Sequence, residues 1–271
     1  MKNKIGFGSE FYEDFGKAAP QRGPEPTILP RPSLVQVHFP ERGLTLSYYN
    51  DRFELHPGDY VYVDGKLEGL RGRVTEVSYH FRIRLSDYKR VTAVADTRVR
   101  GQFFFAGSHL LTFDRAALPY EKVLGWFRAP AEDEEFACGY DDTAFLLDEP
   151  HRWPMSEAVG ERGLDYYSSN KVRYLCLDGT RGRALVEGRE LYEVEFTYED
   201  GEIRNPFCSC YCSGFCKHEA AALLQLRETL DRIETHYAEA FAQSGYFAAV
   251  YRGTFCLYAL DVPGAGSLTL D

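Results

Sequence analysis

The sequence predicts an α+β fold in which a small β-barrel is followed by a β-hairpin and a helix. Between residues 33 and 85, about five short segments alternate apolar and polar residues, with glycine- and proline-containing turns between them, a spacing typical of small barrels. Between residues 218 and 237, apolar residues recur at helical spacing. The 19 Tyr and 19 Phe, set against 2 Met and 2 Trp, also favour a chain rich in strands.

The chain divides into four predicted parts. Residues 1–30 end in a proline-rich stretch, which favours an extended tail. Residues 31–128 are expected to form the barrel with a less regular extension. Residues 129–157 contain acidic runs and prolines and are expected to be an acidic linker. Residues 158–271 are expected to form a second domain, in which strands precede and follow the helix.

Each expected barrel strand combines β-branched or aromatic residues with a bounding turn. The expected strands are SLVQVHF (33–39), LTLSYY (44–49), DYVYV (59–63), GRVTEV (72–77) and YHFRIRL (79–85). In the last segment, successive side chains would point to opposite faces, so that Arg82 and Arg84 lie together on one of them. This alternation predicts a strand with a basic outer surface.

The net charge of −10 is unevenly distributed along the chain. Residues 31–128 carry 15 Lys and Arg against 11 Asp and Glu, a balance of +4, whereas residues 129–271 carry 12 against 26, a balance of −14. Phosphate contacts dominate the affinity of proteins for nucleic acid. The acidic half is therefore a poor candidate for binding DNA or RNA, but the preceding half is not excluded.

The N-terminal half offers a candidate nucleic-acid-binding surface. Basic residues of the expected barrel outnumber the local acidic residues, and tyrosines near them could stack on bases. The candidate residues are Arg71, Arg73, Arg82 and Arg84. The competing interpretation is a solvated face whose arginines bind nothing and whose aromatic neighbours belong to the core.

The seven cysteines are distributed in a way that indicates metal or redox chemistry. Four of them fall within residues 208–216, whereas disulfide-rich secreted domains spread their cysteines to join distant segments. Residues 1–15 lack the apolar core of a signal peptide, and no apolar stretch approaches the ~20 residues that span a bilayer. We therefore expect a cytoplasmic protein that does not associate with a membrane.

The stretch CSCYCSGFCKH, residues 208–218, predicts a zinc site. A structural zinc ion takes four nitrogen or sulfur ligands in a tetrahedron, and the start of a helix favours negatively charged thiolates. The predicted ligands of Zn²⁺ are Cys208, Cys210, Cys216 and His218. Cys212 could replace Cys208, although only three residues would then separate it from Cys216. A redox role is disfavoured, because C-x-C lacks the two-residue spacing of thioredoxin-like motifs.

This arrangement resembles the SWIM zinc finger of bacterial, stand-alone proteins. The resemblance is carried by C-x-C followed by C-x-H and an Ala- and Leu-rich helix, CKHEAAALL, and it extends upstream over RGLDYYSSNKVRYLCLDG and RALVEGRELYEVEF. It covers roughly residues 158–235 and implies a zinc-bound ββα module that binds nucleic acid or protein partners. Such modules occur alone or joined to remodelling-type ATPases and Mutator-type transposases. The five-residue gap between Cys210 and Cys216 is shorter than the range usual in that family.

The N-terminal pattern is similar to the small SH3-like barrels of bacterial nucleic-acid-associated proteins, such as the N-terminal domain of the primosomal helicase. The shared elements are a glycine-containing hairpin, a Pro-Gly-Asp turn before a buried strand, and the motif R-G-x-V. This similarity implies an SH3-like barrel fold for the first domain.

Motifs of common enzymatic chemistry are missing from the sequence. It contains no G-x-x-x-x-G-K-[ST], H-E-x-x-H or G-x-S-x-G, and a zinc ion with four protein ligands has no open position for water. We therefore expect a non-enzymatic zinc-binding interaction protein, an accessory factor that binds nucleic acid, a protein partner or both, with no small-molecule substrate. The alternatives are a purely protein–protein adaptor, or an enzyme with an unrecognised site between the two domains that involves Asp141 or Asp142.

Overall fold

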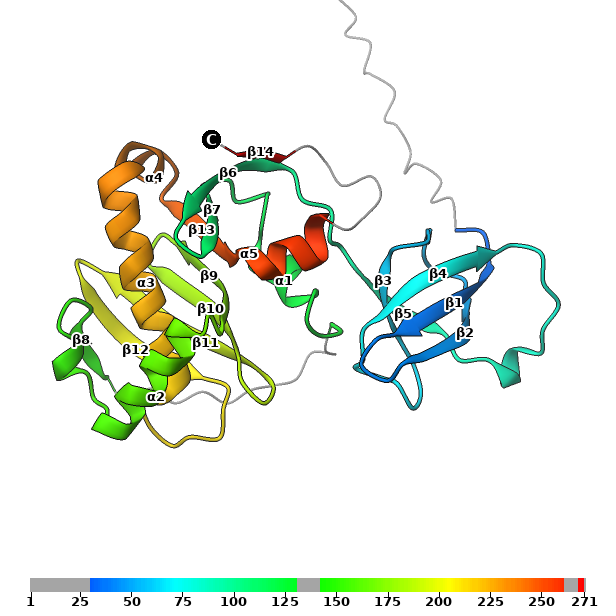
Figure 1. Ribbon diagram of the computed structural model, residues 1–271, viewed down its shortest axis with the longest axis horizontal. Helices are drawn as coiled ribbons and strands as arrows, with labels where there is room; N and C mark the ends of the chain where they lie inside the picture. Colours follow the sequence, from blue (N-terminus) through cyan, green and yellow to red (C-terminus); the bar gives the residue numbers. More distant parts are fainter. Residues whose placement is uncertain (1–29, 131–141, 261–267, 271) are drawn as a thin grey trace, which may run out of the picture.

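The computed structural model describes residues 30–130, 142–260 and 268–270, which form two sheets and a few helices (Figure 1). The α+β class predicted from the sequence is confirmed, and strands make up most of the regular structure. The predicted proline-rich tail, apart from Pro30, lies outside the described residues, as does the acidic run at 131–141. No helix in the described ranges is both long and apolar enough to cross a membrane.

The small sheet consists of the first five strands. They are β1 (Ser33–Phe39), β2 (Leu44–Asn50), β3 (Tyr60–Val63), β4 (Gly72–Ser78) and β5 (Val91–Ala95), in the order β2-β1-β4-β3-β5. Burial alternates along β1, which places Val35 and Val37 in the apolar core of this sheet with no exposed surface. The period of two that predicted this strand is therefore the period of its burial.

The predicted SH3-like barrel is not closed. The edge strands β2 and β5 meet at an isolated bridge between Tyr49 and Arg90, beside a hydrogen bond from the Tyr49 N–H to the Lys89 carbonyl oxygen (2.9 Å). Closure would require a continuous ladder between these two strands, and within the described part of the chain they share this single bridge. The first unit is therefore an open five-stranded sheet.

The segment 79–85 is not a strand, and the prediction made for it is wrong. It belongs to the β4–β5 loop (residues 79–90), which contains a 3-10 turn, η1 (Leu85–Asp87). The fifth strand is instead β5, which pairs with β3. Burial alternates only over residues 80–84, where Phe81 and Ile83 are half-buried and the residues flanking them, including Arg82 and Arg84, are exposed. Alternation indicates an extended backbone, but it does not show whether a partner strand is available.

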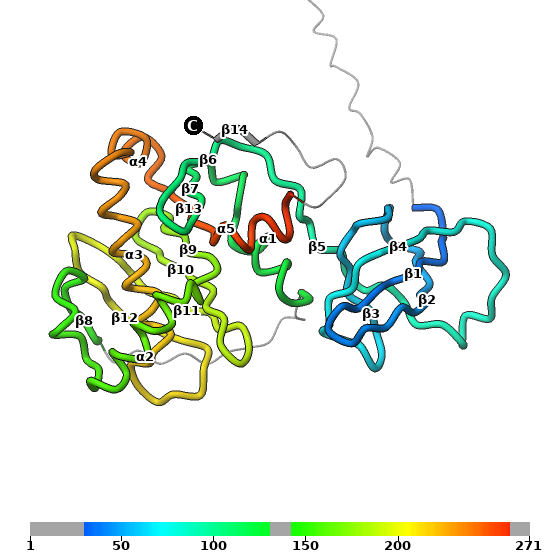
Figure 2. The backbone as a smooth tube through the Cα atoms, viewed as in Figure 1, coloured from blue at the N-terminus to red at the C-terminus, as the bar shows by residue number. Residues whose placement is uncertain are grey.

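The large sheet has nine strands in the order β14-β6-β7-β13-β9-β10-β11-β12-β8. These are β6 (Gly101–Ala106), β7 (His109–Thr112), β8 (Ala144–Leu146), β9 (Val172–Asp178), β10 (Arg181–Glu187), β11 (Leu191–Glu199), β12 (Glu202–Cys208), β13 (Tyr246–Tyr251) and β14 (Leu268–Leu270). The pairs are antiparallel except that of β14 with β6. Figure 2 shows the backbone passing from the small sheet to β6 through residues 96–100.

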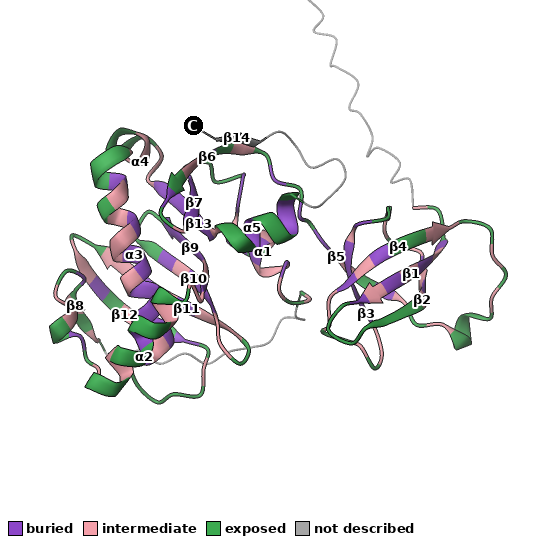
Figure 3. Cartoon of the chain, in the orientation of Figure 1, coloured by how far each residue is buried: buried purple, intermediate pink, exposed green. Residues whose placement is uncertain are grey.

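The central strands of the large sheet are buried on both faces. In β9, Tyr174 and Cys176 join one apolar cluster, whereas Leu175 and Leu177 join a second cluster on the opposite face. Strands covered on both sides carry continuous apolar runs, which explains the run YLCL in β9. Burial is greatest in these strands and along one side of the long helix that covers them (Figure 3).

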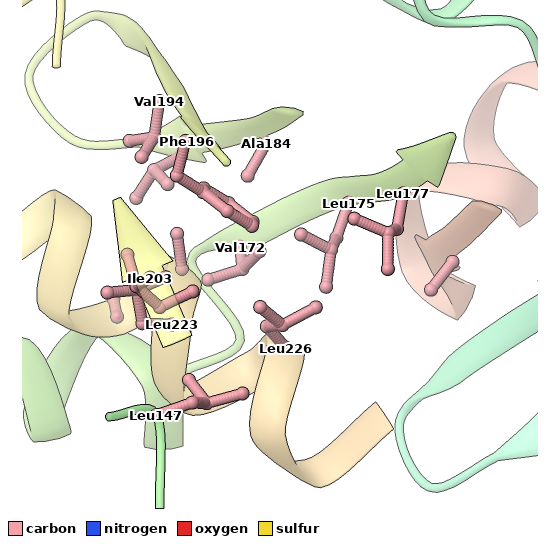
Figure 4. Packing of buried hydrophobic residues seen from close by; sticks show 14 of the residues in the cluster. Leu147, Val172, Leu175, Leu177, Ala184, Val194, Phe196, Ile203, Leu223 and Leu226 are labelled. Atoms are coloured by element: carbon pink, nitrogen blue, oxygen red, sulfur yellow. The ribbon is translucent and has the colours of Figure 1, made fainter. Parts of the chain in front are cut away.

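The helices lie around the large sheet. They are α1 (Tyr120–Leu124), α2 (Glu157–Ser168), α3 (Lys217–His236), α4 (Ala238–Ser244) and α5 (Arg252–Phe255), with short turns η2 (Pro150–Arg152) and η3 (Cys256–Leu260). The helix predicted at 218–237 is confirmed as α3. Its Leu223 and Leu226 point into the second cluster, toward Val172 and Leu175 of β9 (Figure 4). Gly163 allows α2 to cross α3 closely, since a Cβ there would lie 2.5 Å from Ala220.

The large sheet takes strands from three of the four parts into which the sequence was divided. Residues 31–128 contribute to both sheets, because β6 and β7 belong to the large one. Residues 144–153, within the predicted linker, include β8 at the edge of the large sheet, and Trp153 is buried in its second cluster. The large sheet therefore draws on segments before and after the acidic run.

One apolar cluster contains residues of both sheets. Tyr60 and Tyr62 of β3 point away from the core of the small sheet and join the first cluster of the large sheet, which contains Trp126 and Tyr258. The Tyr62 hydroxyl also donates a hydrogen bond to the Gly125 carbonyl oxygen (3.1 Å). Strand β3 is therefore an element of both units.

Candidate metal centre

Two short segments bring the four predicted metal ligands together. Cys208 is the last residue of β12, and Cys210 follows two residues later. Cys216 immediately precedes α3, and His218 lies in the first turn of that helix. Because α3 packs against β12, the loop 209–215 returns the chain to the same end of the sheet.

Hydrogen bonds to β11 orient the first cysteine pair. The register places Cys208 opposite Val194. Beyond it, the Ser209 N–H donates to the Glu193 carbonyl oxygen (2.9 Å), and the Ser209 hydroxyl accepts from the Glu193 N–H (2.9 Å). Alternate residues of an extended chain share a face, so with Ser209 bonded to β11 the side chains of Cys208 and Cys210 point to the same side.

The second pair is fixed by the capping of α3. The Cys216 N–H donates to the buried Glu219 carboxylate (2.6 Å), and the Cys216 side chain accepts from the Glu219 N–H. This reciprocal capping box satisfies backbone donors that have no partner within a helix. The Cys216 sulfur therefore lies at the positive end of the helix, where a thiolate is favoured.

The four ligand atoms have the spacing of a tetrahedral metal site. All of them lie within 4.8 Å of one another. His218 Nδ1 lies 3.6 Å from the Cys208 sulfur and 3.7 Å from the Cys216 sulfur. For metal–sulfur distances of ~2.3 Å and metal–nitrogen distances of ~2.0 Å, the sulfur–nitrogen edge of a tetrahedron is about 3.5 Å. The cluster therefore can hold a metal ion with little rearrangement.

Two tyrosines hold the His218 ring. Tyr192 of β11 stacks on it with 4.1 Å between ring centroids, and Tyr166 of α2 meets it edge-on at 5.4 Å. Gly188 leaves room for the stack, since a Cβ there would lie 2.8 Å from the Tyr192 ring and 3.3 Å from His218 Nε2. Nε2 is buried without a hydrogen-bond partner among the described residues. Ring packing therefore orients Nδ1 toward the sulfurs.

Burial by itself disfavours the charged forms of these ligands. A hydrogen bond with Cys208, followed by burial, raises the pKa of the Cys216 thiol far above its ordinary value. Burial raises the pKa of the Cys210 thiol to about 11. Burial, together with the charge of Lys217, lowers the pKa of His218 to about 4. At neutral pH the imidazole is therefore neutral and can ligate, whereas the thiols lose their protons when a cation binds.

Aromatic residues anchor the loop that joins the two ligand pairs. Phe215 packs edge-on against Phe145 of β8 (5.6 Å) and tilted against Trp153 (6.1 Å). Sequence reasoning missed these residues, as it missed Tyr192 and Gly188, because no spacing rule connects them with the ligands. Their roles become visible only when β8, β11 and α3 are packed together.

Cys212 lies outside the cluster. Its side chain is exposed, and its sulfur is not among the atoms that converge. The geometry therefore supports Cys208, rather than Cys212, as a ligand. Within the described ranges, no other group of three or more His, Cys, Asp or Glu side chains has the spacing to hold a metal ion.

The four arginines predicted to bind nucleic acid are not brought together. Arg71 precedes β4 and lies between the two sheets, where its guanidinium donates to the Trp126 carbonyl oxygen (2.6 Å). Arg73 is half-buried, 5.8 Å from the centroid of the Tyr60 ring. The other two, Arg82 and Arg84, are exposed beyond the opposite end of β4.

Of the carboxylates considered for an enzyme site, Asp142 is exposed and Asp141 lies outside the described residues.

Comparisons of this chain with protein-family models, with curated proteins and with solved structures find no match.

Proposed function

We propose that Cys208, Cys210, Cys216 and His218 bind one zinc ion with a structural role. Three sulfur donors and one imidazole are a common ligand set of structural zinc. The observation that carries the proposal is the spacing of 3.6 and 3.7 Å between Nδ1 and two of the sulfurs, close to the edge of a zinc tetrahedron. Three of the four side chains are buried, which suits a closed site.

In this proposal zinc joins the β11–β12 hairpin to α3 as a SWIM-type ββα module. The order hairpin, ligand pair, ligand pair, helix is what that resemblance implies, and α3 supplies buried residues to the core beneath it. In small zinc modules the binding free energy of ~10–16 kcal/mol becomes folding free energy. Metal binding would therefore fix the helix on the sheet.

We further propose that the protein is not an enzyme. Catalytic zinc sites have three protein ligands and keep the fourth position for water or substrate. A zinc ion held by all four residues of this cluster would have no such position, so it would stabilise the fold without activating water.

The remaining surfaces support a role as an accessory interaction protein in the cytoplasm, where cysteine thiols stay reduced. The balance of −14 over residues 129–271 suits a protein partner for that half. The exposed arginines of the β4–β5 loop suit nucleic acid. A purely protein–protein adaptor is the second candidate, favoured by the overall charge of −10. It predicts no salt-dependent binding to DNA or RNA.

Metal analysis of three proteins tests the zinc site. The unmodified chain is expected to contain one zinc ion per molecule by elemental analysis. Cys216→Ser is expected to lose the zinc ion and to unfold at a lower temperature, because a hydroxyl is a poor ligand for zinc at neutral pH. Cys212→Ser is the matched control, since it changes the neighbouring exposed thiol and should keep both zinc and stability. Retention of zinc by Cys216→Ser, or its loss from Cys212→Ser, would refute the assigned ligand set.

A further inference from the structure

The β4–β5 loop presents basic side chains far from the metal centre along the chain. It carries four Lys and Arg against one acidic residue, Asp87, whose carboxylate accepts a hydrogen bond from Ser86 (3.1 Å). Arg82 and Arg84 are exposed, and neither has a carboxylate within salt-bridge distance among the residues that the structure describes. These two exposed guanidinium groups, with one residue between them in the sequence, therefore have no carboxylate partner in the part of the chain that the structure describes.

Contacts with the small sheet hold both ends of this loop. Near its start, Phe81 packs edge-on against Tyr49 of β2, with 6.2 Å between centroids. At its end, the Arg90 guanidinium lies 5.2 Å from the centroid of the same Tyr49 ring and forms an ion pair with Asp51. The half-buried residues are thus turned toward the sheet, and the residues that alternate with them are turned outward.

Tyr79 adds an aromatic face to the basic row. Its side chain is 42% exposed, and the Arg31 guanidinium lies 4.9 Å from the centroid of its ring. Proteins that bind single strands combine cationic groups along the backbone with exposed aromatic rings on which bases stack. The loop supplies both groups within six residues, 79–84.

We propose that the β4–β5 loop binds single-stranded nucleic acid, with Arg82 and Arg84 on phosphates and Tyr79 stacked on an unpaired base. This rests on the proposed nucleic-acid-binding function and assigns it a site and a substrate class. A single strand is favoured over a duplex because stacking requires a base face that is already exposed. The loop also contains only a 3-10 turn, whereas major grooves are read by an α-helix or a two-stranded ribbon. Single-stranded DNA and RNA share this chemistry.

Fluorescence anisotropy with the zinc-loaded full chain tests the site. The probes are a labelled 12-nucleotide oligo(dT), a labelled oligo(U) of the same length and a 12-bp duplex. We expect at least one single strand to bind more tightly than the duplex. Arg82→Ala with Arg84→Ala should weaken that binding at least tenfold. It should also reduce the slope of log K against log salt by about 1.4, since each phosphate contact on a single strand contributes about 0.7.

Substitution of Tyr79 separates stacking from charge. Tyr79→Ala is expected to weaken binding of the single strand about tenfold without changing the salt slope, because a stacked base contributes no counterion release. Tyr79→Phe keeps the ring and should bind as the unmodified chain does. Equal affinity for all three forms would overturn the stacking role.

Arg42→Ala with Arg162→Ala is the matched control for charge. Arg42 lies in the β1–β2 turn, at the opposite end of β1 from the loop, and Arg162 lies on α2; both are exposed. If this double variant weakens binding as much as the loop double variant does, the loss of affinity reflects the net charge of the protein, and the assignment of the site to the loop is wrong.

The outcomes also separate this inference from the wider proposal. If oligonucleotides bind and the loop variants bind them equally well, the nucleic-acid-binding function is supported and the site in the loop is refuted. If no oligonucleotide binds, the nucleic-acid-binding function and the loop site are both refuted. The zinc content of the same samples reports on the metal centre independently. Preference for the duplex would overturn the single-strand class. Loop-dependent binding of polyglutamate with no oligonucleotide bound would assign the loop to an acidic protein instead.

Discussion

At the scale of single residues, Gly188 determines whether Tyr192 can stack on the imidazole of His218. A Cβ at position 188 would lie 2.8 Å from the Tyr192 ring, so the ring would have to move. Gly188→Ala is expected to lower the free energy of unfolding by about 1–3 kcal/mol, the usual cost of overpacking. It should also weaken zinc binding, because the ring that orients Nδ1 would be displaced. Urea unfolding and competition with a chelating indicator measure the two effects.

Gly214→Ala provides the control within the loop that joins the ligand pairs. A Cβ at this position meets no atom within 4 Å, and the backbone has no positive φ. Zinc affinity and stability should therefore stay unchanged. Equal losses in the two variants would contradict the role assigned to Gly188.

His109 carries a pH-dependent part of the stability. It has no exposed surface, its Nε2–H donates to the Val172 carbonyl oxygen (2.9 Å), and its Nδ1 accepts from the Ser108 hydroxyl (3.0 Å). Burial lowers its pKa to about 4, whereas an unfolded histidine titrates near ~6.5. Between these two pKa values the unfolded state binds more protons than the native state. The contribution of His109 to the free energy of unfolding is therefore fully present above pH 6.5 and decreases as the pH falls toward 4.

The size of this effect can be measured against a variant that does not titrate. When the pH is lowered from 7.5 to 4.5, the titration of His109 is expected to reduce the free energy of unfolding by about 2–3 kcal/mol. His109→Gln can still donate to the Val172 carbonyl oxygen, and its free energy of unfolding should fall by that much less over the same range. Urea unfolding at both pH values measures the difference. Identical falls in the two proteins would show that other groups account for the acid sensitivity.

At the scale of secondary-structure elements, the accuracy of prediction depended on whether an element is specified locally. Helix α3 could be predicted because its apolar spacing and its first turn lie in one continuous stretch, and the ligand pairs around it are equally local. The segment 79–85 shows the opposite case. It alternates as a strand does, yet β3 pairs with Val91–Ala95 instead, and local alternation contains no information on that choice.

The large sheet and the packing around the metal centre were beyond local patterns for the same reason. Strand β7 pairs with β13, so Leu111 lies opposite Ala249, far away in the sequence. Tyr192 reaches His218 only through the pairing of β11 with β12 and the packing of α3 on them. The identity of the candidate ligands could thus be read from spacing, whereas the residues that orient them required the fold.

At the scale of the whole molecule, Arg71 connects the two sheets. Its guanidinium donates to the Trp126 carbonyl oxygen (2.6 Å), bonds to the Tyr258 hydroxyl and lies 4.3 Å from the centroid of the Tyr258 ring. Tyr60 of β3 lies on the same guanidinium, 5.1 Å from its centre. One side chain from the small sheet is therefore enclosed by groups of the cluster that contains residues of both sheets, and the two sheets are expected to unfold together.

Arg71→Lys tests whether this arginine stabilises the junction or binds phosphate. Lysine keeps the charge but lacks the planar guanidinium, which packs on aromatic rings and donates several hydrogen bonds at once. We therefore expect the free energy of unfolding to fall by about 1–3 kcal/mol. Affinity for single-stranded oligonucleotides should not change, because the guanidinium is engaged within the protein. Tryptophan fluorescence during urea unfolding reports on the junction, since Trp126 lies beside Arg71. Arg42→Lys, at an exposed turn, should change neither quantity. Unchanged stability with weakened oligonucleotide binding would instead make Arg71 a phosphate contact, as its place in the basic sequence suggested.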